Sequence, residues 1–354
     1  MSTRSPREKL VFDVSIGEPQ SGASFAQLDL SGADLKGGTF EKVDFRGANL
    51  SDTDLREAVF TNCDLRGVDL SRSNLIHAVW HDCIAPEAKL VGADLREAQF
   101  FTSELLGADL REARLRNTNL VRCKLGRLDL SGTTSDTLQI LESDTAGINL
   151  SGARLVRSLI MDADLTEASL EGTQLMSAVW MKVLLCGRDL SQVGFERVQF
   201  GNSDLTETVL RGAEFRGGIS FHSAKLDGAD LSGVQADVVN CFQASLIGAK
   251  LVGMRAREGT FVEADLSSAD FSQADLERAV LQDAVCVGTR FNQAKLTYAD
   301  FSRADVSQAD FSGASMFRTR LHGITERDTT WGNRAVALGN DPALRRAETW
   351  KPTY

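Results

Sequence analysis

The sequence lacks long apolar runs and targeting signals. No apolar stretch approaches the ~18 residues that a membrane-spanning helix needs. The N-terminal residues, Met1 to Arg7, lead into only a brief apolar stretch, which is unlike a signal peptide. We therefore expect a soluble, cytoplasmic protein with no membrane partner.

The sequence also lacks the motifs on which catalysis or cofactor binding usually depends. It has no glycine-rich phosphate loop, no nucleophile motif and no cluster of Cys and His at metal-ligand spacing. The nearest approach to a metal site is His77, His81, Asp82 and Cys83, but the repeat described below directs Cys83 inward and both histidines outward, which favours two surface histidines. We predict no catalytic residues, no metal and no cofactor, and hence a protein that is not an enzyme.

Positive charge is in deficit. The chain has 39 Lys and Arg against 49 Asp and Glu, a net charge of −10. This balance argues against direct binding of nucleic acid or of an anionic membrane. It allows a basic partner, or a partner surface that normally holds DNA.

Cysteine is present but gives no disulfide framework. Of the 6 cysteines, Cys63, Cys83 and Cys123 fall at the small inward position of the repeat, and Cys241 and Cys286 fall at its centre. Cysteine at such positions acts as a small buried hydrophobe. A disulfide between Cys63 and Cys83 on adjacent turns is geometrically feasible, but side chains stacked in parallel seldom meet the required geometry.

What the sequence does contain is Leu or Phe at nearly every fifth position from residue 25 to residue 215. We call this residue the centre. Two positions before it stands a small residue, such as Ala33 or Ala48, and one position before it stands a polar residue, often Asp or Asn. Neither the helical period nor the strand period fits this spacing. A short repeat sustained this long indicates a solenoid, in which stacked units bury a column that no unit buries alone.

Every fourth unit shares a character, which predicts four units per turn. Two columns of centres twenty residues apart illustrate this: Leu30, Leu50, Leu70, Leu90, Leu110, Leu130 and Leu150 in one, and Phe40, Phe60, Trp80, Phe100, Leu120, Ile140, Ile160 and Trp180 in the other. Columns that keep separate identities imply that residues twenty apart touch. We expect the backbone to turn a corner at each centre.

These units, with Ala or Cys, then Asp or Asn, then Leu, resemble the pentapeptide repeat family. The resemblance covers roughly residues 23 to 321. It implies an all-β fold, a right-handed quadrilateral parallel β-helix, here with a short C-terminal helical cap. It carries little information about function, which must be argued from sites.

Three segments disturb the repeat. Residues 82–88 contain Pro86, and residues 133–147 replace two centres with Ser135 and Thr145. Each is either a tolerated irregularity, which we favour, or a projecting loop. At residues 216–220 the frame slips by one, and the glycine pair there suits a bulge. One body with a kink is favoured over two domains.

The ends fall outside the repeat and give three regions: 1–24 as an N-terminal cap, 25–321 as the β-helix and 322–354 as a C-terminal cap. Residues 10–16 alternate in polarity and predict a short strand over the first turn. Residues 340–350 predict a short helix with Asn340 or Asp341 as N-cap. Side chains expected to cover the last turn are Trp331, Leu338, Leu344 and Trp350. A homodimer through this tail is a further expectation from the resemblance.

The polar position before one column of centres is rich in aspartate. Together with the tail tryptophans, these residues are the predicted partner-binding set: Asp69, Asp109, Asp129, Asp189, Asp230, Asp270, Asp310, Trp331 and Trp350. Lys89, Lys250 and Arg290 interrupt this acidic stripe. The alternative interpretation is that Asp simply suits the repeat and keeps the protein soluble.

Two functions from different classes follow. The first is a non-catalytic scaffold that binds another protein; the family resemblance allows an accessory role in a bacterial secretion or toxin system, which no residue here selects. The second is a DNA-mimicking regulator that binds DNA gyrase and protects it from inhibitors, as some family members do. Against the second stands a basic group at Arg111, Arg114, Arg116, Arg122, Lys124 and Arg127.

Overall fold

The computed structural model describes residues 4–236 and 238–350. The chain divides into two compact units, Met1–Val183 and Leu184–Tyr354. The sequence instead favours a single body over residues 25–321, because the repeat frame runs through residue 183 without a break.

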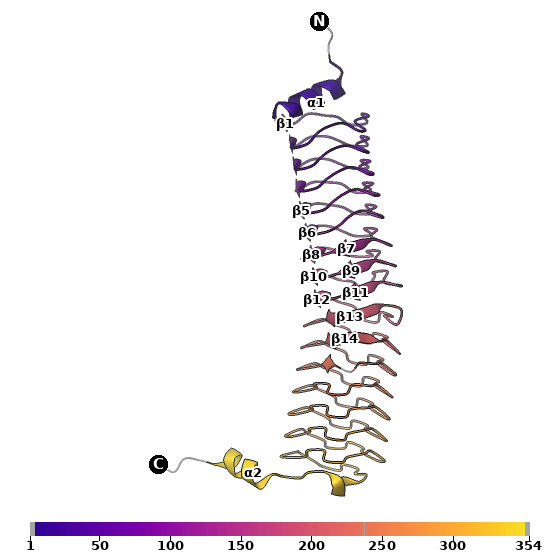
Figure 1. Ribbon diagram of the computed structural model, residues 1–354, viewed down its shortest axis with the longest axis vertical. Coiled ribbons are helices and arrows are strands. Elements are labelled where there is room, and N and C mark those ends of the chain that lie inside the picture. The colour runs from indigo at the N-terminus through magenta and orange to yellow at the C-terminus, as the bar shows by residue number, and fades with distance from the viewer. Residues whose placement is uncertain (1–3, 237, 351–354) are drawn as a thin grey trace. The chain divides into compact units, whose positions relative to one another are not determined.

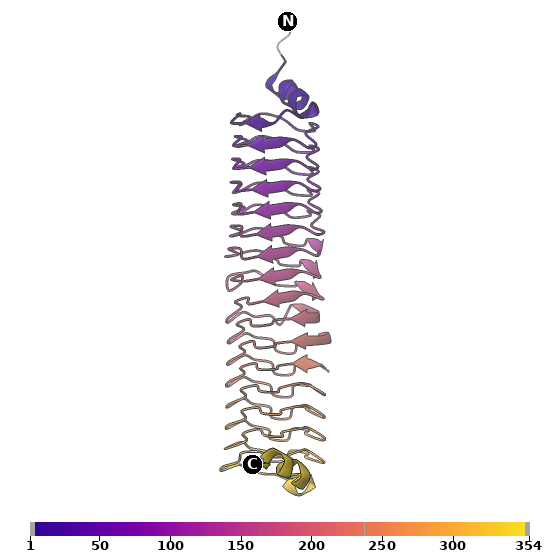
Figure 2. The ribbon, with the colours of Figure 1, turned by 90° about the vertical axis from the view of Figure 1, so that its left-hand side faces the viewer.

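In the first unit a short strand recurs every twenty residues and pairs in parallel with its copies (Figure 2). Phe40 lies opposite Phe60, and Phe60 lies opposite Trp80. The stacked strands are β1 (Gln20–Ser21), β2 (Thr39–Glu41), β3 (Val59–Thr61), β4 (Val79–His81), β5 (Gln99–Phe101), β6 (Asn119–Val121), β8 (Gln139–Leu141), β10 (Leu159–Met161) and β12 (Val179–Met181). The predicted fold class, a parallel β-helix with a twenty-residue turn, is confirmed.

A second stack of strands begins where the sequence repeat weakens. β7 (Thr134–Asp136), β9 (Arg154–Val156) and β11 (Gln174–Met176) pair in parallel, with Ser135 opposite Leu155 and Leu155 opposite Leu175. Residues 133–147 therefore stay in register and form an irregular side rather than a projecting loop, as favoured from the sequence. The hydroxyl of the replaced centre Thr145 donates to the carbonyl of Asp164 at 2.6 Å.

The centres and the small residues before them fill the interior. Leu30, Leu50 and Leu70 are completely buried. The ring of Phe40 stacks on that of Phe60 with centroids 4.9 Å apart, and the tilted ring of Trp80 lies 5.3 Å from that of Phe60. The five cysteines predicted to be inward are buried, and all six thiols are free. Most serines and threonines at inward positions donate to backbone carbonyls; for example, the Ser73 hydroxyl donates to the carbonyl of Leu70. The hydroxyl of the replaced centre Ser135 is buried without a hydrogen-bond partner among the described residues. Burying a hydroxyl without such a partner costs free energy.

Each corner of the circuit lies on the two residues after a centre. The N–H of Ala33 donates to the carbonyl of Leu30 at 3.1 Å, which closes a β-turn around Ser31 and Gly32. Gly32 has a φ of 64°, as the third residue of a type II turn requires. His77 adopts φ 59° at the same position, so glycine is preferred there but not essential. The prediction that the corner lies at the centre itself is wrong by one to two residues.

The corner explains why Pro86 is tolerated. The N–H groups of a centre and of the second residue after it donate to the next turn, as Leu30 and Gly32 do at 2.8 Å. The N–H of the residue between them, Ser31, donates instead to the Asp29 side chain. Pro86 occupies this intermediate position, so its missing N–H removes no bond from the ladder, and its carbonyl still accepts from Gly67.

The N-terminal segment is a helix, not the predicted strand. α1 (Pro6–Ser15) begins with a capping box, in which the Ser5 hydroxyl accepts from the N–H of Glu8 and the Glu8 carboxylate accepts from the N–H of Ser5. Leu10 and Val14 lie one turn apart and are buried. The alternation of residues 10–16 was misleading because the capping box and Pro6 favour a helix. α1 lies next to β1 (Figure 1).

The second unit has the same circuit of twenty residues, with one bulge in it. β13 (Gly194–Gln199) pairs with β14 (Phe215–Ser220), and β14 pairs with β15 (Val239–Asn240). Phe195 lies opposite Phe215 at a separation of twenty, whereas Val198 lies opposite Ile219 at twenty-one. The extra residue lies at Gly217 and Gly218, whose φ values are 69° and 94°. Beyond β15 the turns are joined by single bridges twenty residues apart, such as that between Asp270 and Arg290.

The repeat persists beyond Leu321. Bridges join Asp305 to Thr325 and Asp310 to Thr330, which makes Trp331 a further centre. Its ring stacks on Phe311 with centroids 4.7 Å apart. The 3₁₀ helix η1 (Arg334–Val336) and α2 (Pro342–Thr349) follow, and the Asp341 carboxylate caps α2 as predicted by accepting from Ala343 and Leu344.

Among the described residues, no helix combines the length and the apolar character that crossing a bilayer requires.

Proline substitutions at adjacent corner positions should have opposite outcomes. Val91 directly follows a centre, as Pro86 does, so Val91→Pro should change the free energy of unfolding by no more than about 1 kcal/mol. Gly92 has a φ of 67°, and its N–H donates to Arg111 at 3.0 Å, so Gly92→Pro should cost about 3 kcal/mol or more. Urea denaturation followed by circular dichroism measures both. If both variants lose the same free energy of unfolding, the N–H of Val91 takes part in the ladder as that of Gly92 does, contrary to the assignment above.

The two buried tryptophans differ by one hydroxyl. Trp180 Nε1 donates to Ser158 Oγ at 3.3 Å, whereas Trp80 Nε1 is buried without a hydrogen-bond partner among the described residues. Ala58 holds the position relative to Trp80 that Ser158 holds relative to Trp180. Ala58→Ser should therefore stabilise the protein by about 1 kcal/mol, and Ser158→Ala should destabilise it by a similar amount.

The matched control for this pair is Ala78→Ser, because Ala78 holds the same position relative to Phe100, which has no donor. It should give no gain in the same denaturation experiment. If Ala58→Ser is no better than Ala78→Ser, the hydroxyl does not reach the indole.

Candidate protein-binding surfaces

Aspartate before the centre has a structural role at the corner. Its carboxylate accepts from the N–H two residues later, which is the N–H that the ladder leaves unused. The distances from this N–H are 3.0 Å at Asp29, 2.9 Å at Asp69 and 3.0 Å at Asp230. Asn49 accepts in the same way from Ser51 at 3.1 Å, so the amide serves as well as the carboxylate. The preference for Asp or Asn here follows from this bond.

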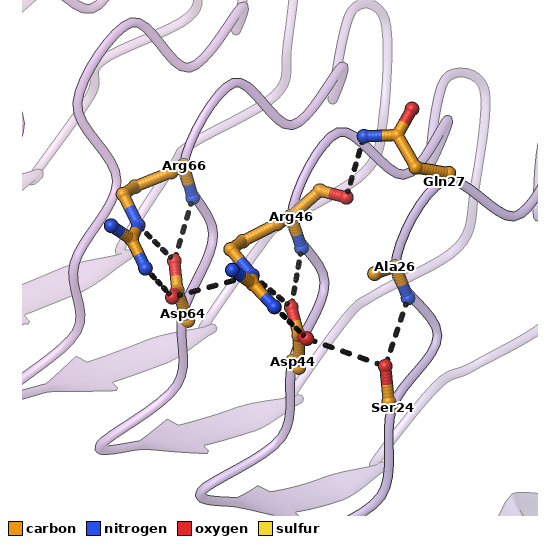
Figure 3. Close-up of polar contacts among 7 residues, drawn as sticks. All are labelled: Ser24, Ala26, Gln27, Asp44, Arg46, Asp64 and Arg66. Atoms are coloured by element: carbon orange, nitrogen blue, oxygen red, sulfur yellow. Dashed lines mark hydrogen bonds and ion pairs between the residues drawn. The ribbon is translucent and has the colours of Figure 1, made fainter.

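An arginine two residues after the aspartate adds an ion pair to the corner. Arg46 Nε and Nη2 donate to the two carboxylate oxygens of Asp44 at 2.9 and 2.7 Å. On the next turn, Arg66 donates to both oxygens of Asp64 in the same way (Figure 3). Arg46 also lies 3.7 Å from Asp64, which links the two turns. In the sequence this motif reads Asp-Leu-Arg or Asp-Phe-Arg.

These pairs change the acidity of the carboxyl groups. The hydrogen bonds from Arg46 hold the pKa of Asp44 far below its usual range, and Arg66 lowers the pKa of Asp64. Arg56 and Arg111 likewise lower the pKa of Asp54 and Asp109. The four carboxylates are therefore charged at neutral pH, but each is already engaged by a cation.

In the first unit, the predicted stripe is a continuous row that is partly neutralised. Single bridges join Asp69 to Lys89 and Lys89 to Asp109, and Asp109 to Asp129. Arg111 lies 2.6 Å from Asp109 and 3.8 Å from Asp129. The structure places these three predicted residues together, with two of the three in contact with one arginine.

In the second unit, the predicted aspartates also belong to one bridged row, Asp189, Val209, Asp230, Lys250, Asp270, Arg290 and Asp310. Asp230 pairs with Arg211, Asp270 pairs with Arg290 at 2.7 Å, and Asp310 accepts from Asn292 at 2.6 Å. Asp230 is only 8% exposed. Three of the four aspartates in this row are thus engaged by an arginine or asparagine side chain of the protein.

The charge density of the row is well below that of DNA. In the first unit the row contains four aspartates and one lysine in eight positions, Asp29, Asn49, Asp69, Lys89, Asp109, Asp129, Asn149 and Ser169. At ~4.8 Å per turn, its net charge of about −3 spans roughly 34 Å. Duplex DNA carries about one charge per 1.7 Å, or roughly 20 over that length. The row taken by itself is a weak imitation of a phosphate backbone.

The basic group singled out from the sequence is mostly paired as well. Four of its six members contact carboxylates: Arg111 with Asp109, Arg114 with Asp94, Arg122 with Glu142, and Lys124 with Glu104. These ion pairs leave neither a strongly basic nor a strongly acidic field on this part of the surface.

The histidines near Cys83 lie apart from it. His77 contacts Glu97 at 3.4 Å and His81 contacts Asp82 at 2.7 Å, both at the surface, while Cys83 is completely buried. Over residues 4–236 and 238–350, no three His, Cys, Asp or Glu side chains converge in a way that could hold a metal ion.

The two predicted tail tryptophans have different environments. Trp331 is half-buried on Phe311, donates to Glu326 at 3.0 Å and lies under the Arg334 guanidinium, so it acts as a lid. Trp350 is 72% exposed and Leu344 is 52% exposed, so the prediction that they cover the last turn is wrong. α2 is held instead by polar contacts of His322, which contacts Glu348 at 3.1 Å and accepts from the N–H of Asp341. Trp350 remains a predicted contact residue.

The bulge in the second unit borders an open groove of about 550 Å³, lined by Phe215, the glycine pair and Val238, among others. A smaller hollow of about 270 Å³ adjoins it and shares Val238. Arginines and glutamates line the two in nearly equal number, and Arg216 pairs with Glu214 while Arg278 pairs with Glu258. No charge of one sign converges there.

A partly apolar surface lies on the outward side of strands β5, β6, β8, β10 and β12. One row consists of Phe101, Val121, Leu141, Met161 and Met181, and the row beside it of Gln99, Asn119, Gln139, Leu159 and Val179. We call these ten residues the strand face. Every one of them is partly exposed. Apolar side chains in an unbroken row of five are unusual on a free protein surface.

Charged corners border the strand face on both sides. The left-handed corner residues after β4 and after the five strands of the strand face are Asp82, Thr102, Arg122, Glu142, Asp162 and Lys182. Those before the same six strands are His77, Glu97, Asn117, Thr137, Arg157 and Ser177. Arg122 and Glu142 lie 3.5 Å apart, and Lys182 and Asp162 lie 3.7 Å apart. An apolar centre with a charged rim is the usual anatomy of a protein-binding surface.

The sequence-based prediction missed the strand face. It examined the residue before each leucine centre, where aspartate recurs, and not the residue after each aromatic centre. The signal was present in the sequence: Phe101, Val121, Leu141, Met161 and Met181 recur at a spacing of twenty at a position that is polar in most units.

Comparison with known proteins agrees with the fold. A family model described as a pentapeptide repeat region matches residues 33–110, and a model of eight pentapeptide repeats matches residues 103–134, 146–179, 195–233, 240–278, 260–297 and 274–313. The chain therefore belongs to the pentapeptide repeat family. No curated protein matches the chain.

Solved structures of pentapeptide repeat proteins are also similar. A trypsin-treated variant of QnrB1, a plasmid-mediated fluoroquinolone resistance protein, has 19% identity over 52% of this chain and 90% of its own, with a TM-score of 0.41. HetL, involved in heterocyst differentiation regulation in the cyanobacterium Nostoc sp. strain PCC 7120, has 28% identity over 65% of this chain and 89% of its own, with a TM-score of 0.21. At these TM-scores the likeness adds nothing about partners.

Stability should fall with acid because of the corner pairs. A carboxyl whose pKa is lowered by folding stabilises the protein above its unfolded pKa of about 4, and this contribution is lost as the pH falls toward the folded pKa. The triple variant Asp54→Asn, Asp64→Asn and Asp109→Asn keeps the corner acceptor but removes the titration. Between pH 6 and pH 3, its free energy of unfolding should decrease less than that of the wild type, as urea denaturation would measure.

A companion variant removes the cause of the shifts and keeps the carboxyl groups. Replacing Arg56, Arg66 and Arg111 with glutamine should also flatten the pH dependence at low salt. Unchanged pH dependence in both triple variants would rule out a contribution from these pairs.

Proposed function

We propose that this protein is a non-catalytic scaffold that binds another protein through the strand face. The observation that carries the proposal is the unbroken apolar row from Phe101 to Met181 on a backbone fixed by parallel pairing. A preorganised surface loses little conformational entropy on binding. Met161 and Met181 add flexible side chains that adapt to a partner.

The charge distribution supports a protein partner rather than nucleic acid. The chain has a net charge of −10, and its arginines are widely engaged by carboxylates, as at Arg46 and Arg111. Binding to a phosphate backbone would require uncompensated basic groups.

The test is affinity capture from host extract with three versions of the chain. Leu141→Asp places a charge in the strand face, and Val156→Asp places one at a partly exposed position on β9, outside the strand face, as the matched control. We expect the wild type and the Val156→Asp variant to retain the same protein and the Leu141→Asp variant to lose it. A retained protein, including a differently tagged copy of this chain, is then purified and its dissociation constant measured.

Identical captures by the wild type and Leu141→Asp would refute the strand face as the binding surface. Circular dichroism must first show that both variants are folded. The identity of the captured protein would also decide whether the scaffold serves a secretion or toxin system.

The DNA-mimic alternative remains open to a direct test, and the net charge of −10 is what favours it. Purified gyrase is assayed for supercoiling and for inhibitor sensitivity with micromolar amounts of the protein. The weak and partly neutralised aspartate row leads us to expect no effect. A change in either activity that is lost on replacing Asp69 and Asp129 with lysine would support mimicry instead.

A further inference from the structure

We propose that the occupant of the strand face is a second copy of this chain, packed face to face about a two-fold axis parallel to the strands. This inference rests on the proposed function and names the partner of the same surface. In such a dimer the order of the turns is reversed, but each row of residues lies opposite the same row of the other copy. Such a dimer requires one alignment of the turns that places compatible side chains opposite one another in every row.

One alignment places compatible side chains opposite one another in the row of corner residues that follow the strands. If the axis passes midway between β6 and β8, Arg122 lies opposite Glu142 of the other copy, and Asp82 lies opposite Lys182. Each of these pairs occurs twice because the axis is two-fold. All four are pairs of opposite charge, and the remaining two positions, Thr102 and Asp162, carry no repulsion.

The edge that precedes the strands selects the same alignment independently. There Glu97 lies opposite Arg157 of the other copy, and Asn117 lies opposite Thr137. His77 lies opposite Ser177. No like charges meet at either edge.

The apolar row between the edges also agrees. Val121 lies opposite Leu141 of the other copy and Phe101 opposite Met161, so apolar side chains meet along the middle of the row. At each end of the row, Met181 lies opposite His81 of β4. A methionine sulfur against an aromatic ring is a favourable contact. Sheets that pack in this way lie about 10 Å apart, which the side chains of the corner residues can span.

Neighbouring alignments fail. A shift of one turn in one direction places Arg122 opposite Arg122 and Asp82 opposite Asp162, and a shift in the other direction places Glu142 opposite Glu142. A shift of two turns brings Asp82 opposite Glu142, or Arg122 opposite Lys182. Like charges across an interface are costly, so the pattern specifies a single alignment. In a two-fold dimer, a charge must not face a like charge when the order of the turns is reversed. A face that binds an unrelated partner has no such requirement.

The experiment is sedimentation velocity on the full chain over a range of concentrations. We expect a reversible monomer–dimer equilibrium, with the association constant reduced at least about tenfold by Leu141→Asp. Arg122→Glu alone should weaken the dimer because the introduced carboxylate would face Glu142 of the other copy. Glu142→Arg alone should weaken it because the introduced guanidinium would face Arg122.

The decisive experiment mixes the Arg122→Glu and Glu142→Arg variants. In the mixed dimer, each acidic side chain at position 122 or 142 of one chain faces an arginine of the other, so association should return to near the wild-type value. Mixing leaves the broken pair within each chain unchanged, so recovery can come only from contacts between chains. Arg72→Glu, which breaks an equivalent pair with Asp52 on another side of the turn, is the control and should leave dimerisation unchanged.

Three results would overturn the proposal. They are a monomer at concentrations on the order of 100 µM, where even a weak interface should assemble, no recovery on mixing the variants, or a dimer that Trp350→Ser abolishes and Leu141→Asp does not. The last would assign the dimer to the tail. If the chain is monomeric but Leu141→Asp still loses a captured protein, the proposed function stands and only the identity of its partner changes.

Discussion

The fold depends on one recurring backbone hydrogen bond, from the N–H of each centre to the carbonyl of the residue nineteen positions ahead. Leu30 donates to Asn49, and Leu50 donates to Asp69. This bond fixes the circuit at twenty residues and brings equal side chains into register. Because each turn contacts only its neighbours, the core is a set of columns, and local irregularities such as Pro86 or Ser135 stay local.

The columns of centres could be predicted from the sequence, whereas the two ends of the fold could be predicted only in part. The Leu30 column and the Phe40 column were identifiable because burial imposes apolar identity every twenty residues. α1 was mistaken because Leu10 and Val14 fit both an alternating and a helical pattern, and only the Ser5 and Glu8 side chains decide between them. Trp331 was identified as a lid but not as a centre, because no familiar unit surrounds it. Exposed Leu344 and Trp350 could not be distinguished from covering residues by composition alone.

The candidate surfaces were harder to predict than the fold. Aspartate attracted attention because it recurs, yet its recurrence reflects the corner N–H that it satisfies. Arginine follows it in several units for the same local reason. The strand face has no motif, since its residues are twenty positions apart and vary in kind from Phe101 to Met181. Pairing of the strands must be known before these residues become neighbours.

The bulge at the glycine pair has a consequence for how this chain can change its length. Any residue added to a circuit would move every later centre off its column. Here one extra residue is absorbed, because Gly217 and Gly218 adopt positive φ and a Cβ on Gly217 would lie 2.8 Å from the Arg197 side chain. Insertions and deletions in such a protein are therefore quantised: they come as whole circuits, or one residue at a time where a left-handed glycine takes up the surplus.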